Sequence, residues 1–396
     1  MTATEPVGSL MQNYAAPGVT FVRGQGTELW DNRGRRYLDF LTGLAVCSLG
    51  HSHPVVAEAI AEQARTLVHV SNLFGNELAP RLAGVLDLLV GDGTPLGGRV
   101  FFANSGAEAN ECAIKLARKW AGPGRHVVVS AYGSFHGRTL ATLHATGQPS
   151  KHEPFQPLPE GFRHVAWSEV DALEACLDPS VAAVLLEPVQ GEGGVNPAAP
   201  GFLAEVRRIC DERGILMIMD EVQAGLGRTG RWFGFQHDGV VPDIVTMAKA
   251  LGNGFPIGAC WAKPDVADAF VPGDHGSTFG GQPLAAAAAA ATLRVMRQED
   301  VPALATSKGE ALARALGALR GVKEVRGRGL LLAAELESEQ AKAVAAEALE
   351  RGLVVNAVTS TALRFAPPLL VSDEEISEAL AILQASLDAV TAREDG

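Results

Sequence analysis

Two short apolar runs that each end in a charged residue constrain this chain more than any other feature of its sequence. Residues 215–219 (ILMIM) lead directly into Asp220, and residues 244–248 (IVTMA) lead directly into Lys249. Apolar runs of this length, each preceded by a glycine or proline turn signal, are typical of strands buried on both faces of a parallel sheet. An open α/β sheet binds its ligand outside the carboxyl ends of such strands. We therefore expect Asp220 and Lys249 to face one ligand site.

A lysine at the end of a buried strand needs a chemical reason, because burying an uncompensated ammonium group is costly. Condensation with an aldehyde as a Schiff base is one such reason, and pyridoxal phosphate is the commonest aldehyde cofactor of this kind. The same cofactor needs a carboxylate at its pyridine nitrogen. The sequence therefore predicts that Lys249 bears pyridoxal phosphate and that Asp220 pairs with its ring nitrogen.

A junction between a strand and a helix upstream offers a seat for the phosphate. Residues 99–103 are predicted as a strand, and Ser105 with Glu108 forms a capping-box pattern that starts a helix. The turn at Gly106 and Ala107 would present backbone N–H groups and the positive end of the helix dipole. An ordinary turn between a strand and a helix would show the same pattern, so this alternative stays open.

The strand expected at residues 126–130 is followed by a loop that contains Phe135, His136 and Arg138. The ring of Phe135 suits stacking on a planar cofactor, and Arg138 suits bidentate binding of a carboxylate. The alternative is that Phe135 fills the core and Arg138 is a solvated surface charge. The loop taken alone favours that alternative.

Further polar residues follow a strand or lie in glycine-rich turns. The buried strand expected at residues 181–186 ends at Glu187, and Glu192 follows in a glycine-rich loop. Ser277 and Thr278 stand among glycines and suit a second phosphate contact. A solvated loop charge and a plain turn are the alternatives to these two interpretations.

The chain of 396 residues is long enough for two domains. Residues 1–48 alternate short apolar pieces with turn signals, and residues 49–297 alternate strands with helices. Residues 298–396 shift to helices rich in Glu, Ala, Leu and Arg with short strands between them. We expect a large ligand-binding domain over 49–297, a smaller α+β domain over 298–396, and residues 1–48 packed beside the smaller domain.

The charge balance and the cysteines narrow the classes of function. A net charge of −12 argues against nucleic acid or an anionic membrane surface as a general partner. Residues 1–14 lack a basic start followed by an apolar core, and the small-residue run 284–291 is too short to span a bilayer. Five scattered cysteines predict a cytoplasmic protein with reduced thiols. His51 and His53 have no third ligand spaced near them, so we interpret them as structural and expect no metal.

Seven motifs in a fixed order resemble the ornithine-type branch of the class III aminotransferases, which are fold-type I pyridoxal-phosphate enzymes. The motifs are SGAEANE (105–111), FHGRT (135–139), EPVQGEGG (187–194), DEVQAGLGRTG (220–230), AKALGNGFPIGA (248–259), GSTFGGQPLA (276–285) and LRFAPPL (363–369). The resemblance covers nearly the whole chain, from Tyr14 to the last predicted helix. It implies an α/β large domain with a mostly parallel seven-stranded sheet flanked by helices, and a smaller α+β domain. It also implies a homodimer whose subunits share their active sites.

The resemblance implies a role for each matched position. Lys249 would hold the cofactor and shuttle a proton to and from the substrate carbon. Asp220 would keep the pyridine nitrogen protonated, Gln223 would hydrogen-bond the phenolic oxygen, and Phe135 would stack on the ring. The remaining cofactor contacts implied are Ser105, Gly106, Ala107, His136, Glu187 and, from the neighbouring subunit, Thr278.

The resemblance also implies the substrates, N2-acetylornithine as amino donor and 2-oxoglutarate as acceptor, in a step of arginine biosynthesis. Arg138 and Arg364 would bind the substrate carboxylates. Glu192 would neutralise Arg364 in the first half-reaction and release it for 2-oxoglutarate in the second. A removable neutraliser would explain how one pocket accepts both a distal amine and an α-keto acid.

Three further positions bear on the donor. Tyr14 would contact a carboxylate, and Ser277 is a further implied substrate contact. Leu44 stands where ornithine enzymes usually carry a tyrosine, and an apolar side chain there leaves room for an N-acyl group. Other distal amines stay open as donors, namely succinylornithine, ornithine, 4-aminobutyrate and succinyl-diaminopimelate. An aminomutase of the glutamate-semialdehyde type is a more distant alternative, and so is a binding protein without catalysis.

Overall fold

The computed structural model describes residues 10–394, and its largest sheet has seven strands. Its strands are β4 (Arg99–Ala103), β5 (Val127–Ala131), β6 (Phe162–Val165), β7 (Val181–Leu186), β10 (Leu216–Asp220), β11 (Ile244–Met247) and β12 (Gly258–Ala262). Their order is β4-β12-β11-β10-β7-β5-β6, and only β12 runs antiparallel to its neighbours. The predicted mostly parallel seven-stranded sheet is therefore confirmed.

Helices cover both faces of this sheet because successive strand residues point to opposite sides. In β10, Met217 and Met219 pack in one core cluster, whereas Leu216 and Ile218 pack in another. Helix α8 (Phe202–Arg213) contributes to the first cluster and α4 (Gly106–Ala121) to the second. The other helical segments from residue 54 to residue 298 are α2 (Pro54–Thr66), α3 (Leu78–Val90), α5 (Leu140–Ala145), α6 (Pro149–His152), η2 (Glu153–Phe155), α7 (Val170–Cys176), η3 (Gly234–Asp238), η4 (Lys249–Leu251), α9 (Pro264–Ala267) and α10 (Pro283–Gln298).

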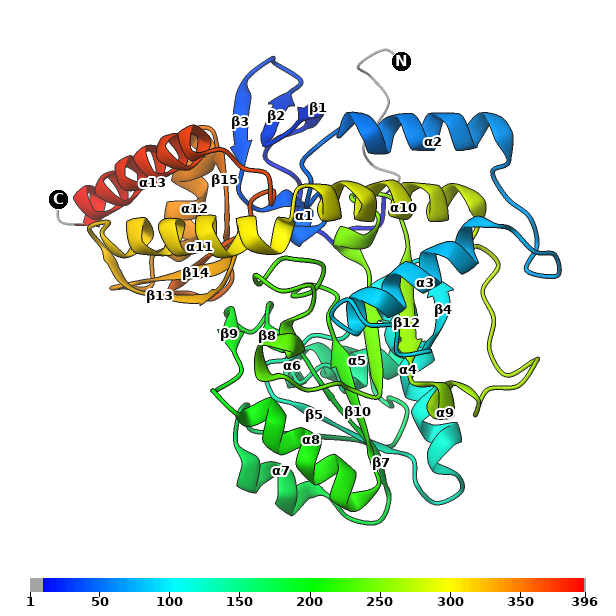
Figure 1. Ribbon diagram of the computed structural model, residues 1–396. Coiled ribbons are helices and arrows are strands. Elements are labelled where there is room, and N and C mark those ends of the chain that lie inside the picture. Colours follow the sequence, from blue (N-terminus) through cyan, green and yellow to red (C-terminus); the bar gives the residue numbers. More distant parts are fainter. Residues whose placement is uncertain (1–9, 395–396) are drawn as a thin grey trace.

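The C-terminal part of the chain forms a second unit, which is of the α+β class and is drawn in yellow to red in Figure 1. Its sheet has the order β13-β14-β17-β16, and helices α11, α12 and α13 pack with it. The bounds of these elements are α11 (Val301–Gly317), β13 (Val322–Arg328), β14 (Leu331–Leu336), α12 (Ala341–Glu350), β16 (Asn356–Ala357), β17 (Ala362–Phe365) and α13 (Asp373–Glu394). The fold class predicted for the whole chain is confirmed by this second unit.

The N-terminal strands join the C-terminal part in a third sheet. Strands β1 (Phe21–Gln25), β2 (Glu28–Asp31) and β3 (Arg36–Asp39) are antiparallel, and β15 (Leu353–Val354) adds in parallel to β3. Segments more than three hundred residues apart in the chain therefore lie side by side. This pairing places strands β1 to β3 beside the smaller unit, while the division of the chain into domains stays a prediction.

Between β3 and α2 the chain makes a left-handed helical turn, α1 (Thr42–Ala45), in which all four residues have φ between 51° and 70°. This conformation costs roughly 1–2 kcal/mol for each residue other than glycine. Asp39 stabilises it by accepting the Thr42 backbone N–H at 2.7 Å, and the Thr42 hydroxyl donates to the Ala366 carbonyl at 2.8 Å. The turn thus depends on the C-terminal unit.

Helix α10 explains how an alanine-rich segment serves this fold. Its small side chains allow the close packing of α2 and α3, and the three helices lie together in Figure 1. Within residues 10–394, no helix combines the length and the apolar character that a membrane crossing requires.

Candidate active site

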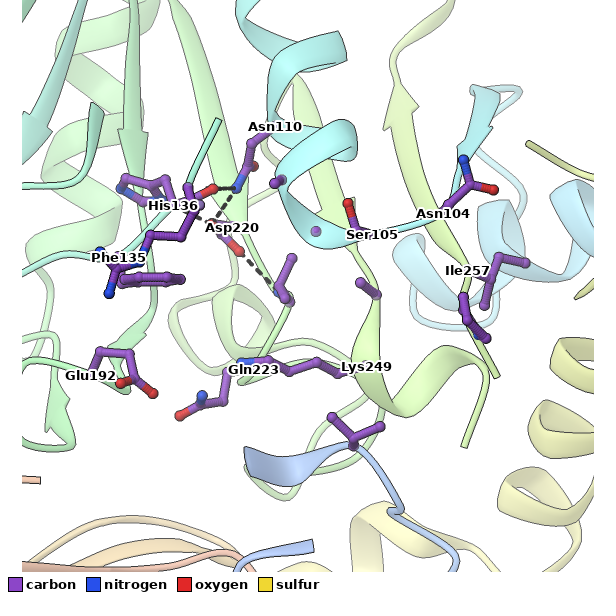
Figure 2. Close-up of a pocket in the computed structure, with 18 of the residues that line it drawn as sticks. Asn104, Ser105, Asn110, Phe135, His136, Glu192, Asp220, Gln223, Lys249 and Ile257 are labelled. Atoms are coloured by element: carbon purple, nitrogen blue, oxygen red, sulfur yellow. Dashed lines mark hydrogen bonds and ion pairs between the residues drawn. The ribbon is translucent and has the colours of Figure 1, made fainter. Parts of the chain in front are cut away.

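A cavity of about 370 Å³ lies at the carboxyl ends of β10 and β11, and both Asp220 and Lys249 line it (Figure 2). The two strands are parallel neighbours in which Asp220 stands opposite Thr246. The register therefore brings the acid and the lysine to the same edge of the sheet. The other lining residues include Val46, Asn104, Ser105, Gly106, Ala107, Asn110, Phe135, His136, Arg138, Glu187, Glu192, Val222, Gln223 and residues 254–257.

Asp220 is buried and held by several hydrogen-bond donors. Its Oδ2 accepts hydrogen bonds from Asn110 Nδ2 at 2.7 Å and from His136 Nδ1 at 2.8 Å, while Oδ1 accepts the Val222 backbone N–H at 3.0 Å. Thr246 in turn donates to Asn110 Oδ1 at 2.7 Å. These contacts, which converge on Asp220 in Figure 2, hold the carboxylate in one orientation without a permanent cation.

Lys249 follows the last residues of β11 and begins the short helix η4. Burial lowers the pKa of its amine below the usual value, and Arg364 lowers it further. The carboxylates of Glu192, Asp220 and Glu187 oppose this shift without cancelling it. A lower pKa raises the fraction of neutral amine, which is the form that attacks an aldehyde carbon.

Ser105 caps helix α4, as the sequence predicts. Its hydroxyl accepts the Glu108 backbone N–H at 3.2 Å. The reciprocal contact differs from the expected capping box, because the Glu108 carboxylate accepts the backbone N–H of Asn104, at 2.6 Å, instead of that of Ser105. The helix still starts at Gly106, because the Ser105 half of the box satisfies the first turn.

The first turn of α4 presents its backbone to the cavity. Gly106 and Ala107 both line it, and a Cβ at Gly106 would lie 2.8 Å from Val222 Cγ1. Glycine therefore fits best where the helix start approaches the segment that follows β10. Free N–H groups at this helix terminus can bind a phosphate.

Phe135 and Arg138 reach the cavity from the loop after β5. The Phe135 backbone N–H donates to Glu187 at 3.0 Å, and the Gly191 N–H donates to the same carboxylate at 3.3 Å. Burial raises the pKa of Glu187. Glu187 thus ties the Phe135 loop to the glycine-rich loop, while the exposed Arg138 guanidinium lies 5.5 Å from the centre of the Phe135 ring.

Glu192 and Arg364 form an ion pair between the two units, with Oε1 and Nη1 2.6 Å apart. Arg364 is buried and also donates to the Gly191 carbonyl and to Gln223 Oε1, each at 3.2 Å. Burial alone would raise the pKa of Glu192, but the guanidinium outweighs it and the pKa lies below its usual value. Arg364 itself reaches the cavity only through Glu192 and Gln223, which line it.

Four predicted site residues lie elsewhere. Tyr14 is 84% exposed in the irregular segment before β1, and Leu44 lies in the left-handed turn beside Val46. Ser277 and Thr278 line a neighbouring cavity of about 310 Å³. The structure of one subunit therefore does not bring these four side chains to the cavity that holds Lys249.

Asn110 is the most consequential site residue that sequence reasoning missed. It joins Asp220, the His136 backbone carbonyl and Thr246 in one network. A signal was present, since Asn110 lies on the apolar stripe of α4 with Ala109 and Ala113. A polar residue on a buried helix face needs hydrogen-bond partners. Its presence therefore indicates a functional or structural hydrogen-bond network.

The two histidines interpreted as structural differ in their contacts. His51 Nε2 lies 2.7 Å from Asp39 Oδ2, whereas His53 Nδ1 is buried without a partner among the described residues. Across residues 10–394, no group of three or more His, Cys, Asp or Glu side chains is placed to hold a metal ion.

A protein family and several known proteins match this chain over most of its length. The family described as aminotransferase class-III matches residues 10–387. An acetylornithine aminotransferase of Caldanaerobacter subterraneus subsp. tengcongensis is 50% identical over 382 residues, covering 94% of this chain and 96% of that protein. One of Gloeobacter violaceus is 49% identical over 384 residues, covering 95% and 94%.

Two solved structures extend the likeness to the fold. An ornithine aminotransferase of Toxoplasma gondii, described with partial occupancy of PLP at its active site, has a TM-score of 0.92 and 37% identity, covering 98% of this chain and 94% of its own. An N-acetylornithine aminotransferase of Stenotrophomonas maltophilia K279a has a TM-score of 0.82 and 40% identity, covering 96% and 98%. Both likenesses span the described fold from end to end.

Proposed function

The chain belongs to the class-III aminotransferases, and we propose that it transfers the δ-amino group of N2-acetylornithine to 2-oxoglutarate with pyridoxal phosphate as cofactor. The products are N-acetylglutamate 5-semialdehyde and glutamate, as in a step of arginine biosynthesis. The proposed chemistry rests on one observation: Lys249 and Asp220 line the same cavity. The relatives that share about half of the sequence carry the choice of donor.

The residues around the cavity fit pyridoxal phosphate. Ser105, Gly106 and Ala107 would hold the phosphate at the start of α4, and Phe135 would cover one face of the ring. His136 Nε2 is buried and has no partner among the described residues, so the imidazole still has a free nitrogen beside the site. When bound, the cofactor supplies an electron sink for charge that develops on the substrate carbon.

The protein's own groups then divide the work. Lys249 would hold the aldehyde carbon of the cofactor and, through Nζ, would carry a proton to and from the substrate carbon. Asp220, fixed by Asn110 and His136, would keep a proton on the ring nitrogen. Gln223, which lines the cavity, is the proposed donor to the phenolic oxygen.

The ion pair of Glu192 and Arg364 supports exchange between two substrates. With the pair closed, Arg138 is the arginine that lines the cavity, and it would bind the carboxylate of N-acetylornithine far from the reacting amine. When Glu192 moves away, Arg364 would bind the 2-oxoglutarate carboxylate next to the ketone, while Arg138 binds the other carboxylate. This exchange stays a prediction for the chain.

Leu44 bears on the choice between N-acetylornithine and free ornithine. It lies in the turn next to Val46, which lines the cavity, and it offers no polar group to a free α-amine. The likeness to a solved ornithine aminotransferase makes ornithine the second candidate, at 37% identity against 50% for the acetylornithine relative. We favour the acylated donor because of the likeness to the acetylornithine relatives.

We also propose that the chain is a homodimer in which Thr278 contacts the cofactor of the other subunit. Asn72 binds the Ser277 carbonyl at 2.9 Å, so the loop at Asn72 lies against the turn at Thr278. Large apolar side chains are exposed on these two segments, since Phe74 is 69% exposed and Phe279 is 63% exposed. Apolar side chains exposed together mark an interface. Sedimentation should give about twice the 41.4 kDa of one chain, and a fully active monomer would contradict the proposal.

A cytoplasmic location belongs to the same proposal. All five cysteines have free thiols in the structure, as is usual for proteins in a reducing compartment. Fractionation of cells that express the native gene would test this location.

Steady-state kinetics over a panel of donors tests the proposed function. N-acetylornithine, succinylornithine, ornithine, 4-aminobutyrate and succinyl-diaminopimelate are each offered with 2-oxoglutarate. We expect the highest kcat/KM for N-acetylornithine and no turnover without an added keto acid. A higher kcat/KM for free ornithine would overturn the choice of donor, and turnover without a keto acid would indicate an aminomutase.

A further inference from the structure

Two cations, Arg138 and Lys151, lie beside the ring of Phe135. Arg138 Cζ is 5.5 Å and Lys151 Nζ is 5.3 Å from the ring centre. Among the described residues, neither side chain has an Asp or Glu carboxylate within ion-pair distance. Two cations near one ring repel each other, and an anion bound between them would relieve that repulsion.

Contacts of its own hold Lys151 in this place. It belongs to the short helix α6, and its ammonium group donates to the side-chain carbonyl of Gln148. Gln148 Nε2 in turn donates to the Ser134 carbonyl at 3.0 Å. Lys151 is therefore fastened to the loop that carries Phe135 and Arg138, and it is half-buried.

Lys151 interacts electrostatically with charged groups of the cavity. Burial lowers the pKa of Lys151, Arg138 lowers it further, and Glu192 raises it, so the three groups interact electrostatically. The Glu192 carboxylate is already paired with Arg364 at 2.6 Å. Both cations lie within 5.5 Å of the centre of the Phe135 ring, and Arg138 lines the cavity, whereas Lys151 stands behind its lining residues.

We propose that Lys151 is a specificity-determining residue, which with Arg138 forms the site for the substrate carboxylate far from the reacting atom. The inference rests on the proposed function, because both N-acetylornithine and 2-oxoglutarate carry such a carboxylate. Arg138 lines the cavity and contacts the carboxylate directly, while Lys151 adds its charge from beside the ring. Keto acids without a remote carboxylate gain nothing from Lys151.

The first arm of the test measures binding to the holoenzyme without turnover. Calorimetry gives the dissociation constant of glutarate, an unreactive dicarboxylate, for the wild type and for Lys151→Met, Lys151→Arg and the control Lys323→Met, a lysine exposed on β13. We expect Lys151→Met to weaken glutarate about tenfold, in the range for loss of one charge-assisted contact. Lys151→Arg should restore most of the affinity, and Lys323→Met should not change it.

The second arm compares acceptors. We expect Lys151→Met to raise KM for 2-oxoglutarate about tenfold with kcat changed less than about twofold, and to leave kcat/KM for pyruvate unchanged. Unchanged glutarate affinity and unchanged KM for 2-oxoglutarate would overturn the inference. Equal losses with 2-oxoglutarate and pyruvate would also overturn it, because they indicate a merely structural role.

The two arms separate this inference from the proposed function. A wild type that does not turn over N-acetylornithine, but whose glutarate affinity falls in Lys151→Met, would overturn the donor and support the carboxylate site. A wild type that does turn over N-acetylornithine, with glutarate affinity equal in all variants, would overturn the role of Lys151 alone.

Discussion

Three carboxylates line the cavity, and the protein holds two of them, Asp220 and Glu192, in opposite ways. Asp220 ends a central strand, is 4% exposed, and is fixed by Asn110 and His136, neither of which carries a permanent charge. Glu192 lies in a glycine-rich loop, its side chain is 28% exposed, and its dominant contact is one ion pair with Arg364. Asp220 is held within the large sheet, whereas Glu192 is held by an ion pair with the C-terminal unit.

The difference indicates which partner each acid serves. A carboxylate with converging hydrogen bonds cannot turn away without leaving buried donors unpaired, so Asp220 suits a partner that stays bound throughout catalysis. A carboxylate in a loop with one ionic partner loses little when it moves, so Glu192 suits substrates that alternate. The site thus has a fixed half, which is Asp220 with its hydrogen-bond partners in the large unit. It also has an adjustable half, which is Glu192 with Arg364 at the boundary between the units.

Replacing Lys249 should have the largest effect, because it tests the fixed half at its reacting atom. We expect Lys249→Ala to lower turnover by about 10²–10⁴-fold or more, the range for a positioned acid–base group. The variant should still bind cofactor through the start of α4, but borohydride should attach none covalently. Lys263→Ala is the control, because Lys263 follows β12, whose antiparallel direction places it beside Asp243. Normal turnover in Lys249→Ala would place the reacting amine elsewhere.

Replacing Asp220 tests whether its charge, and not only its shape, serves the ring nitrogen. Asp220→Asn keeps the size but removes the charge, and we expect kcat to fall about 10²–10³-fold, as for loss of a preorganised electrostatic group. Asp243→Asn is the control, a buried acid paired with Arg207 and Lys263. It should lower stability but not kcat per folded molecule. Equal kcat in Asp220→Asn and the wild type would remove the fixed half from the mechanism.

The fixed half was also the half that the sequence predicts well. Parallel strands are apolar throughout, so the charge at the end of each run marks its position, and Asp220 and Lys249 could be assigned to one edge of the sheet. The start of α4 was predictable for a similar reason, since Ser105 and Gly106 carry local turn and capping signals. In each case the signal lies within a few residues of the feature.

The sequence could not predict features that depend on distant contacts. The left-handed turn at residues 42–45 needs the Ala366 carbonyl, which lies more than three hundred residues away in the chain. The pairing of Glu192 with Arg364, which belongs to β17, was expected only from the family resemblance and from no local pattern. Asn110, in helix α4, was missed because its partners Asp220 and Thr246 belong to two strands far along the chain. Local patterns do not encode such pairings.

Replacing Glu192 sharpens the comparison at the adjustable half. Glu192→Gln leaves Arg364 unneutralised while the donor binds, so we expect kcat/KM for N-acetylornithine to fall about tenfold, in the range of one charge-assisted contact. The half-reaction with 2-oxoglutarate should change less than about twofold, because there Arg364 is already released. Single-turnover measurements of each half-reaction would show this asymmetry. Equal effects on both would contradict the exchange of partners.

The smallest effect concerns stability, at Glu221 beside Asp220. Glu221 is buried and accepts the backbone N–H groups of Gly234 at 2.9 Å and Phe235 at 3.0 Å. Burial raises its pKa from 4.5 to about 8, against the opposing effect of the two N–H donors. Glu221 is therefore favoured in its protonated form. Its two hydrogen bonds also stabilise the first residues of η3.

The sign of the resulting pH dependence follows from proton binding. A raised folded-state pKa means that the folded chain binds more protons than the unfolded chain between the two pKa values, so the free energy of unfolding falls as pH rises from about 5 to about 8. One such group contributes at most about 1.4 kcal/mol per pH unit. Glu221→Gln does not titrate, so urea unfolding should show a shallower fall for it than for the wild type, whereas the exposed control Glu324→Gln should follow the wild type. Parallel curves for Glu221→Gln and the wild type would mean that Glu221 is ionised in the folded protein, and that the fixed half tolerates two adjacent charges.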